Sequence, residues 1–150
     1  MIRRATAADA EPLLALMRGL ARFEGYAADF SVTPGDLVER GLAPTGPSQF
    51  TAFVGEGAAG LLGYAVVVEI PFTCDLRPTL LLKELFVADG RRGQGIGRGL
   101  FERVRAHGHE RGCGRIVWTV LPDNAQAQAF YRRAGGAPDA AWQHWKLPLN

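Results

Sequence analysis

The stretch from Leu82 to Arg98 constrains the fold of this chain more than any other. A run rich in strand-forming residues, 82–87, leads into a turn, and glycines then alternate with larger residues before the amphipathic segment 100–111. This order predicts a strand, a glycine-rich loop and a helix. Glycine lets the backbone approach a ligand closely, and the first N–H groups of a helix lack intrahelical partners at the positive end of its dipole. The stretch therefore predicts a phosphate-binding loop.

The glycine spacing excludes two common nucleotide-binding loops. A P-loop requires G-x-x-x-x-G-K-[ST], and the chain contains no Lys-Ser or Lys-Thr pair. A dinucleotide fingerprint requires G-x-G-x-x-G, whose third glycine position falls on Arg98 or on Leu100, depending on whether the count starts at Gly93 or Gly95. What remains is an arginine followed by glycines three and five residues later, in 92–97. A glycine-rich surface turn with solvated arginines is the alternative interpretation.

Composition and charge limit the class of protein and its partners. The 150 residues suffice for one domain with a core, and 47% hydrophobic and 21% charged residues are typical of a globular fold. The net charge of +2 is too small to indicate nucleic acid, and no apolar run is long enough to cross a membrane. The N-terminus does not resemble a signal peptide. We therefore expect a single cytoplasmic domain over residues 1–150 that binds neither nucleic acid nor membrane.

Hydrophobic periodicity and turn residues predict alternating strands and helices. The expected strands span 2–5, 50–54, 61–70, 79–87, 115–121 and 142–147. The first expected helix has its cap at Thr6 or Asp9 and ends near Gly25, and the second is capped by Thr33 and stopped by Gly41. The third has an apolar stripe from Ile96 to Val104 and stops at Gly112 or Gly114, and the fourth spans 125–134. The glycine-rich link 55–60 indicates an antiparallel hairpin. His107 and His109 are two residues apart on a helix, so they are poor joint metal ligands, and we predict that both lie on the surface.

The loop 23–30 mixes aromatic and carboxylate side chains. Such a loop could bind an amine through cation–π contacts and charge, or it could serve only as a packed connection between two helices.

Two motifs at the expected separation resemble those of the GCN5-related (GNAT) N-acetyltransferases. Residues 92–97 match the acyl-CoA pyrophosphate loop [QR]-x-x-G-x-[GA], and residues 124–136 match N-x-x-A-x-x-F-Y-x-x-x-G-F, with Gly136 in place of the final aromatic. The resemblance covers nearly the whole chain. It implies an α/β (α+β) GNAT fold, with a central mixed, mostly antiparallel twisted sheet flanked by helices and splayed strands at the acetyl-CoA site.

Within the superfamily, the chain is most similar to the diamine (spermidine/spermine) N-acetyltransferase branch. Residues 2–9, 20–24 and 130–133 and Trp142 carry this similarity. A homodimer is expected by analogy.

The resemblance implies acetyl-CoA as co-substrate, without a metal. Backbone groups of the strand would bind the pantetheine and the thioester oxygen, loop amides would bind the pyrophosphate, and the second motif would fix the cofactor arm. The implied cofactor-binding residues are Leu85, Phe86, Val87, Arg92, Gly93, Gln94, Gly95, Ile96, Gly97, Arg98, Asn124, Ala127 and Tyr131. Tyr131 also occupies the position of the general acid that protonates the CoA sulfur.

The acceptor side departs from the diamine branch. That branch has a Leu-Glu-Asp triplet where this chain has Leu82-Lys83-Glu84, so Lys83 replaces a carboxylate and would repel a cationic polyamine. Glu84 remains as the candidate base. Neighbours on a strand point to opposite faces, so both side chains line one site only if the strand contains a bulge. The predicted substrate-binding residues are Phe23, Glu24, Lys83 and Trp118.

These residues predict an N-acetyltransferase that moves an acetyl group directly from acetyl-CoA to a primary amine of a small molecule. A diamine, an amino acid or a thialysine-like compound would fit. Acetylation of a protein N-terminus or lysine is a rival prediction, and a non-catalytic acyl-CoA sensor is another.

Overall fold

The computed structural model describes residues 1–149, which form two compact units, Met1–Trp118 and a second that begins at Thr119. The first unit contains a five-stranded sheet with helices on both faces. The second contains α4 (Ala125–Arg133) and an extended segment after it. The expectation of one domain over residues 1–150 stays a prediction.

The sheet of the first unit is mixed and mostly antiparallel. Its strands are β1 (Ile2–Arg4), β2 (Thr51–Gly57), β3 (Gly60–Ile70), β4 (Thr79–Val87) and β5 (Arg115–Val117), in the order β1-β2-β3-β4-β5. Neighbours from β1 to β4 are antiparallel, and β5 joins β4 in parallel. The predicted fold class is confirmed, as is the predicted hairpin, whose turn is tighter than the link 55–60 suggested.

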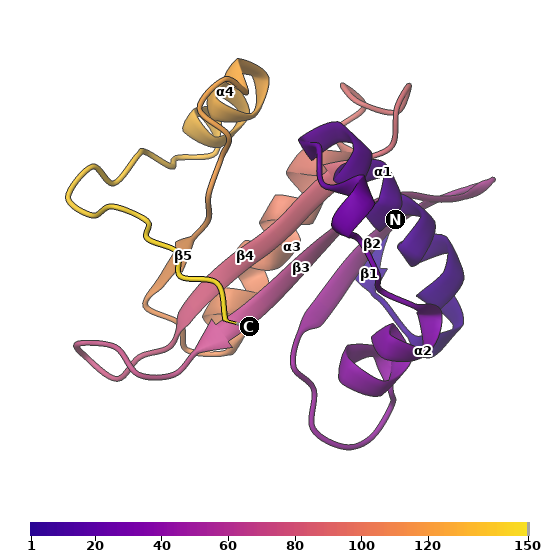
Figure 1. Ribbon diagram of the computed structural model, residues 1–150, viewed down its shortest axis with the longest axis horizontal. Coiled ribbons are helices and arrows are strands. Elements are labelled where there is room, and N and C mark those ends of the chain that lie inside the picture. Colours follow the sequence, from indigo (N-terminus) through magenta and orange to yellow (C-terminus); the bar gives the residue numbers. More distant parts are fainter. Residues whose placement is uncertain (150) are drawn as a thin grey trace. The chain divides into compact units, whose positions relative to one another are not determined.

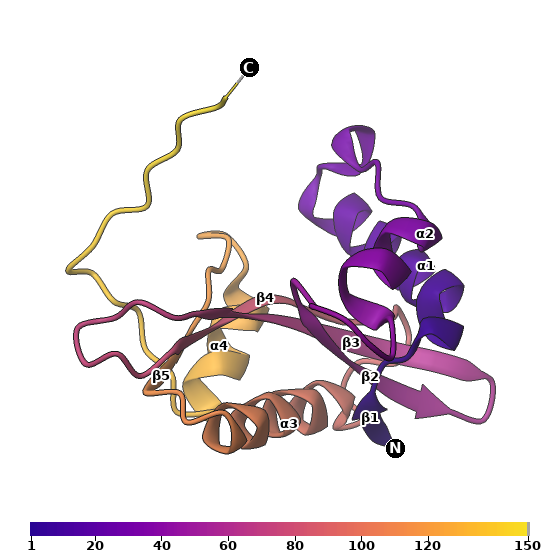
Figure 2. The same cartoon turned by 90° about the horizontal axis from the view of Figure 1, so that it is seen from below.

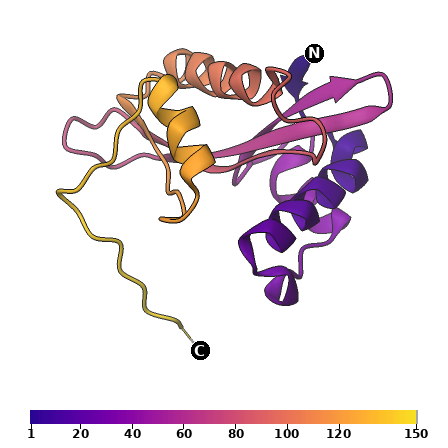
Figure 3. The same ribbon diagram turned by 90° about the horizontal axis from the view of Figure 1, so that it is seen from above.

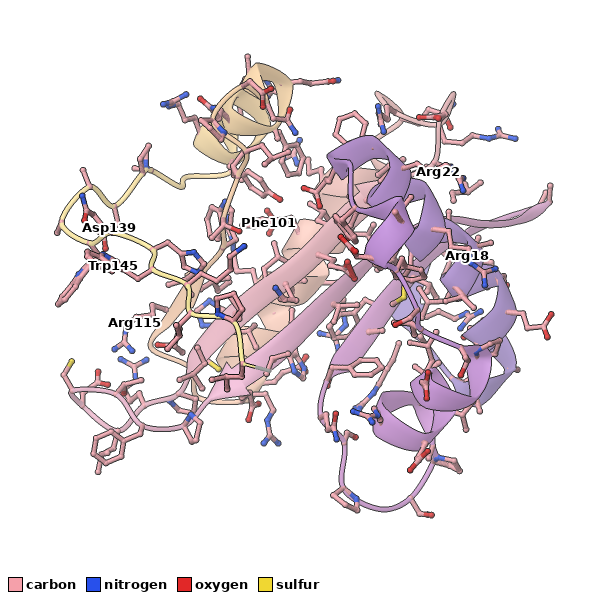
Figure 4. All side chains as sticks on the ribbon, in the orientation of Figure 1. Arg18, Arg22, Phe101, Arg115, Asp139 and Trp145 are labelled. Carbon is pink, nitrogen blue, oxygen red and sulfur yellow. The ribbon has the colours of Figure 1, made fainter. Side chains whose placement is uncertain are left out.

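Helices cover both faces of this sheet. α1 (Ala10–Glu24) and the short α2 (Pro34–Leu37) lie on one face, and α3 (Ile96–Glu110) lies on the other (Figures 2 and 3). α1 ends where Gly25 adopts a φ of +86° and its amide donates to the Ala21 carbonyl. Arg18 and Arg22 lie on the exposed side of α1 (Figure 4). The 3-10 turns η1 (Ala7–Asp9) and η2 (Ala27–Asp29) flank this helix.

α2 begins as its sequence predicts. The Thr33 hydroxyl accepts a hydrogen bond from the Asp36 amide at 3.1 Å, and Pro34 occupies the first helical position. A short π-helical segment, η3 (Val38–Leu42), continues α2 and includes Gly41.

Apolar side chains fill the space between the sheet and each helical layer. On the α1 side, the stripe of Leu13, Met17 and Leu20 packs with strand residues such as Tyr64 and Phe86. On the α3 side, Leu100 and Val104 are buried. This burial of two amphipathic faces is the main stabilising contribution to the unit.

One predicted surface residue is buried. His107 is only 7% exposed, and its ring meets Phe53 of β2 edge-on at 5.3 Å between centroids. His107 follows Leu100 by seven residues and Val104 by three, so it lies on the same buried face of α3 as these two side chains. Helical periodicity, rather than the polarity of the side chain, therefore determines its burial. His109 is exposed, as predicted.

Two strand predictions need correction. β5 ends at Val117 rather than Leu121, and the expected strand at 142–147 is absent: the segment has no strand pairing in the described residues. Trp142 and Trp145 are 82% and 84% exposed. Figure 4 shows the Trp145 side chain pointing away from the ribbon. Alternating large side chains favour extended backbone, but a strand also requires a hydrogen-bonding partner, which such a pattern does not supply.

Candidate active site

β4 and β5 separate beside the predicted cofactor strand. The two strands pair only where Thr79–Leu81 meets Arg115–Val117. From Leu82 to Val87 that edge of β4 has no paired strand among residues 1–149, so the predicted splay is present. This length of edge carries Leu85, Phe86 and Val87. An unpaired edge offers backbone groups to an extended, amide-containing ligand.

The loop after β4 has an accessible backbone. Gly93 and Gly95 have φ values of +79° and +81°, a conformation that favours glycine, and a Cβ added at either would meet nothing within 4 Å. The Gly99 amide makes an early intrahelical bond, to Gly95 oxygen at 3.0 Å, so the preceding amides at 96–98 lack helical partners. The loop and the start of α3 therefore fit a phosphate group.

Arg92 connects this loop to the neighbouring elements. Its guanidinium lies over the Phe23 ring at 5.1 Å and the Phe86 ring at 5.7 Å, donates to the Val87 carbonyl at 3.3 Å and pairs with Asp89 at 3.3 Å. These contacts hold the loop against the end of α1 and the end of β4. Phe23 is thus a stacking partner of Arg92.

A β-bulge lies at the centre of β4. Glu84 pairs with Val66 and Leu82 pairs with Val67, so Lys83 is the extra residue and has no partner of its own on β3. Regular alternation would direct Lys83 and Glu84 to opposite faces. The bulge interrupts that alternation, which removes the geometric conflict between the two predicted site residues.

Glu84 lies against two tyrosines. The Tyr26 hydroxyl donates to a carboxylate oxygen of Glu84 at 3.3 Å. The Tyr64 hydroxyl is buried and reaches no hydrogen-bond partner in the described chain, although Glu84 interacts with it electrostatically. Burial raises the pKa of Glu84, and the hydrogen bond from Tyr26 and the charge of Lys83 partly oppose that rise. The site therefore contains a carboxylate that binds a proton more readily than an exposed one.

The tyrosine hydroxyls are correspondingly hard to ionise. The pKa of Tyr26 is raised to about 12, first by burial and then by the charges of Glu84 and Glu24. Burial, followed by the charge of Glu84, also raises the pKa of Tyr64. Both tyrosines are therefore neutral at neutral pH, and the Tyr26 hydroxyl donates to Glu84.

Glu24 and Lys83 belong to the same electrostatic cluster. Partial loss of hydration raises the pKa of Glu24, which stands at the end of α1, and the Lys83 charge opposes that shift. Glu24, Lys83 and Glu84 are thereby brought together from α1 and β4. The ring of Trp118, just after β5, packs edge-on against Phe101 of α3 at 5.5 Å, and its substrate-binding role stays a prediction.

The residues of the second motif lie in the second unit. The Asn124 side chain accepts from the Ala127 amide at 3.0 Å and so caps α4. Tyr131 is half-buried on α4, with its ring 5.2 Å from that of Phe130. The cofactor roles predicted for Asn124 and Ala127 and the acid role of Tyr131 stay predictions.

Sequence reasoning did not single out Tyr26 and Tyr64. Tyr26 lies in the aromatic and acidic loop that was expected to bind an amine or simply to pack. Tyr64 carries a phenol on an otherwise apolar strand, two residues before the partner of Glu84. A polar group inside an apolar strand was the available signal.

The described residues contain no group of three or more His, Cys, Asp or Glu side chains placed to hold a metal ion. None of the helices in residues 1–149 has both the length and the apolar character needed to cross a membrane.

Comparison with known proteins gives consistent matches. Residues 21–136 match the acetyltransferase (GNAT) family. Thialysine N-epsilon-acetyltransferase of Bos taurus is 25% identical over 97% of this chain and 88% of its own length. Streptothricin acetyltransferase of Streptomyces lavendulae is 38% identical, over 57% of this chain but only 43% of its own length. An aminoglycoside N-acetyltransferase in complex with CoA shares the fold, with a TM-score of 0.74 at 18% identity, covering 99% of this chain and 100% of that one.

Proposed function

Because this chain belongs to the acetyltransferase (GNAT) family and is an acetyl-CoA-dependent N-acetyltransferase, we propose that it acetylates a primary amine of a small molecule by direct transfer. The observation that carries the small-amine proposal is the partly buried Glu84 carboxylate, held by Tyr26 on the strand whose free edge would bind the co-substrate. The thialysine, streptothricin and aminoglycoside enzymes are similar proteins whose names specify amine-bearing acceptors of small size.

The residues that would hold acetyl-CoA fit its chemistry. Loop amides of Gly93–Arg98 would bind the pyrophosphate, and Arg92 would add positive charge or hold the loop closed against Phe23. Backbone groups of Leu85, Phe86 and Val87 would pair with the pantetheine amides and with the thioester oxygen. Bound there, acetyl-CoA supplies an acetyl group activated as a thioester.

Glu84 would act as the general base. An amine is nucleophilic only when neutral, so a proton must leave the ammonium form, and Glu84 would accept it directly or through a water molecule. Its raised pKa makes the carboxylate a better proton acceptor than an exposed glutamate. Tyr131 would donate a proton to the leaving sulfur, and Asn124 and Ala127 would position α4 for that role.

The cellular setting belongs to the same proposal. Acetyl-CoA is available inside cells, which favours action in the cytoplasm. A homodimer is proposed by analogy with the family alone.

A matched pair of variants tests the proposal. Free thiol release from acetyl-CoA would be followed with a panel of diamines, diamino acids, aminoglycosides and lysine-containing peptides, using wild type, Glu84→Gln and the exposed control Glu39→Gln. We expect small amines to be acetylated, Glu84→Gln to lower turnover about 10²- to 10³-fold with acetyl-CoA affinity retained, and Glu39→Gln to match wild type.

Other outcomes identify the rivals. Turnover confined to peptides would indicate a protein acetyltransferase. Acetyl-CoA binding without thiol release across the whole panel would indicate a sensor. Full activity of Glu84→Gln would remove the base assignment but leave the acetyltransferase.

A further inference from the structure

The bulge in β4 places a positive charge beside the proposed base. Glu84 lies opposite Val66 and Leu82 lies opposite Val67, so Lys83 is an inserted residue without a partner on β3. A bulge at this point costs ladder hydrogen bonding, and bulges near active sites commonly re-aim a side chain. Here the inserted residue is one of only two lysines in the chain, the other being Lys146.

The surroundings of Lys83 are acidic, yet they do not fix its ammonium group. Its charge acts on both Glu24 and Glu84. Lys83 is exposed, and the described residues include no carboxylate within 4.0 Å of its nitrogen. The ammonium is therefore near two carboxylates but free to bind another anion.

Charge balance at this cluster disfavours a simple polyamine. Two carboxylates and one ammonium leave a single net negative charge, enough to attract one cationic amine. A diamine brings a second positive charge with no carboxylate left to pair with it, close to Lys83. An acceptor with two amines and one carboxylate would match each charge with an opposite one.

We propose that the acceptor is an amino acid with a side-chain amine, whose carboxylate is bound by Lys83 while its reacting amine lies at Glu84. Lys83 is then a specificity residue that contacts the substrate. This inference rests on the proposed function, since it assumes that the cluster receives the acceptor amine.

Two pairs of acceptors isolate the carboxylate. Lysine and cadaverine differ only by the α-carboxylate, and so do ornithine and putrescine. Wild type should show kcat/KM at least tenfold higher for the amino acid of each pair, as expected for a charge-assisted hydrogen bond gained in one case and repulsion in the other.

Variants of Lys83 should change this ratio in a graded way. Lys83→Met keeps the length of the side chain but removes its charge, so the amino acid and the diamine should become about equal. Lys83→Glu should reverse the preference. Lys146→Met, which removes the other lysine, should leave the wild-type ratio unchanged.

Two results would overturn the role of Lys83 while leaving the acetyltransferase proposal intact. One is equal kcat/KM for both members of each pair in wild type, and the other is a preference for the amino acid that is unchanged in Lys83→Met. Failure to acetylate any of the four compounds, with turnover on peptides only, would overturn both proposals together.

Discussion

The carboxylate of Glu84 is useful as a base only above its pKa, and its immediate neighbours set that pKa. Burial raises it, and the hydrogen bond from the Tyr26 hydroxyl lowers it. The ionised form is the one that accepts a proton, so activity should be present above the pKa of Glu84 and lost as the pH falls through it. In the proposed mechanism, Tyr26 would be a positioning residue that extends the active range toward acid.

Tyr26→Phe tests this role, since it removes the hydroxyl and keeps the ring. The pKa of Glu84 should rise further, so the acid limb of the kcat/KM profile should move to higher pH, with a roughly two- to tenfold loss on the acid side from one missing hydrogen bond. The measurement is the pH–rate profile. The control is the same change made in Glu84→Gln: a full additional loss there would show that Tyr26 does not act through Glu84.

At the scale of elements, the contact between β3 and β4 holds the site strand in place and leaves no room for a side chain at Gly63. A Cβ at this position would lie 2.7 Å from the Phe86 carbonyl oxygen and 3.3 Å from Leu100. The nearer atom belongs to the backbone, so it cannot move aside as a side-chain end could. The strand that carries the predicted cofactor contacts is thus fixed by a glycine outside the motif.

Gly63→Ala should therefore destabilise the protein by about 1–3 kcal/mol and weaken acetyl-CoA binding, because β4 must shift to accept the methyl group. Gly35→Ala is the matched control. Gly35 lies in α2, where alanine is favoured over glycine, and a Cβ added there would be 3.8 Å from its nearest neighbour, the Thr33 hydroxyl, so no loss of stability is expected. Urea denaturation and calorimetric titration with acetyl-CoA measure the two effects. If Gly63→Ala is as stable as wild type, β3 and β4 can accommodate the added methyl group without an energetic cost, and the prediction is wrong.

Elements with strong local signals were predicted correctly, whereas the strand expected at 142–147 was wrong and the bulge in β4 was not fixed by the sequence. The Thr33 cap and the Gly25 stop are local, and both are present. The strand expected at 142–147 required a partner, and the bulge at Lys83 depends on how β4 aligns with β3. The sequence predicted site roles for Glu84 and Lys83, which stay predictions, but left open how one strand could present both side chains.

The buried histidine illustrates a different limit. His107 was assigned to the surface from its polarity, although its helical spacing from Leu100 and Val104 placed it on the buried face. Contact with the Phe53 ring makes that burial possible. Periodicity was the stronger signal for His107.

At the scale of the whole molecule, the chain carries the proposed acid and the proposed base in different compact units. Glu84, the unpaired edge of β4 and the glycine-rich loop belong to the first unit, and α4 with Tyr131 belongs to the second. Loss of the acid should slow the chemical step without weakening the cofactor site of the first unit.

Tyr131→Phe should lower kcat about 10²-fold while the Kd for acetyl-CoA stays within about twofold, because only the proton donated to the leaving sulfur is lost. Asn124→Ala provides the contrast. It removes the α4 cap, at a cost of about 1 kcal/mol, so it should lower thermal stability as well as activity. The measurements are single-turnover rates and calorimetric affinities. If kcat is unchanged in Tyr131→Phe, water or another group must donate the proton. The role of α4 would then be limited to binding.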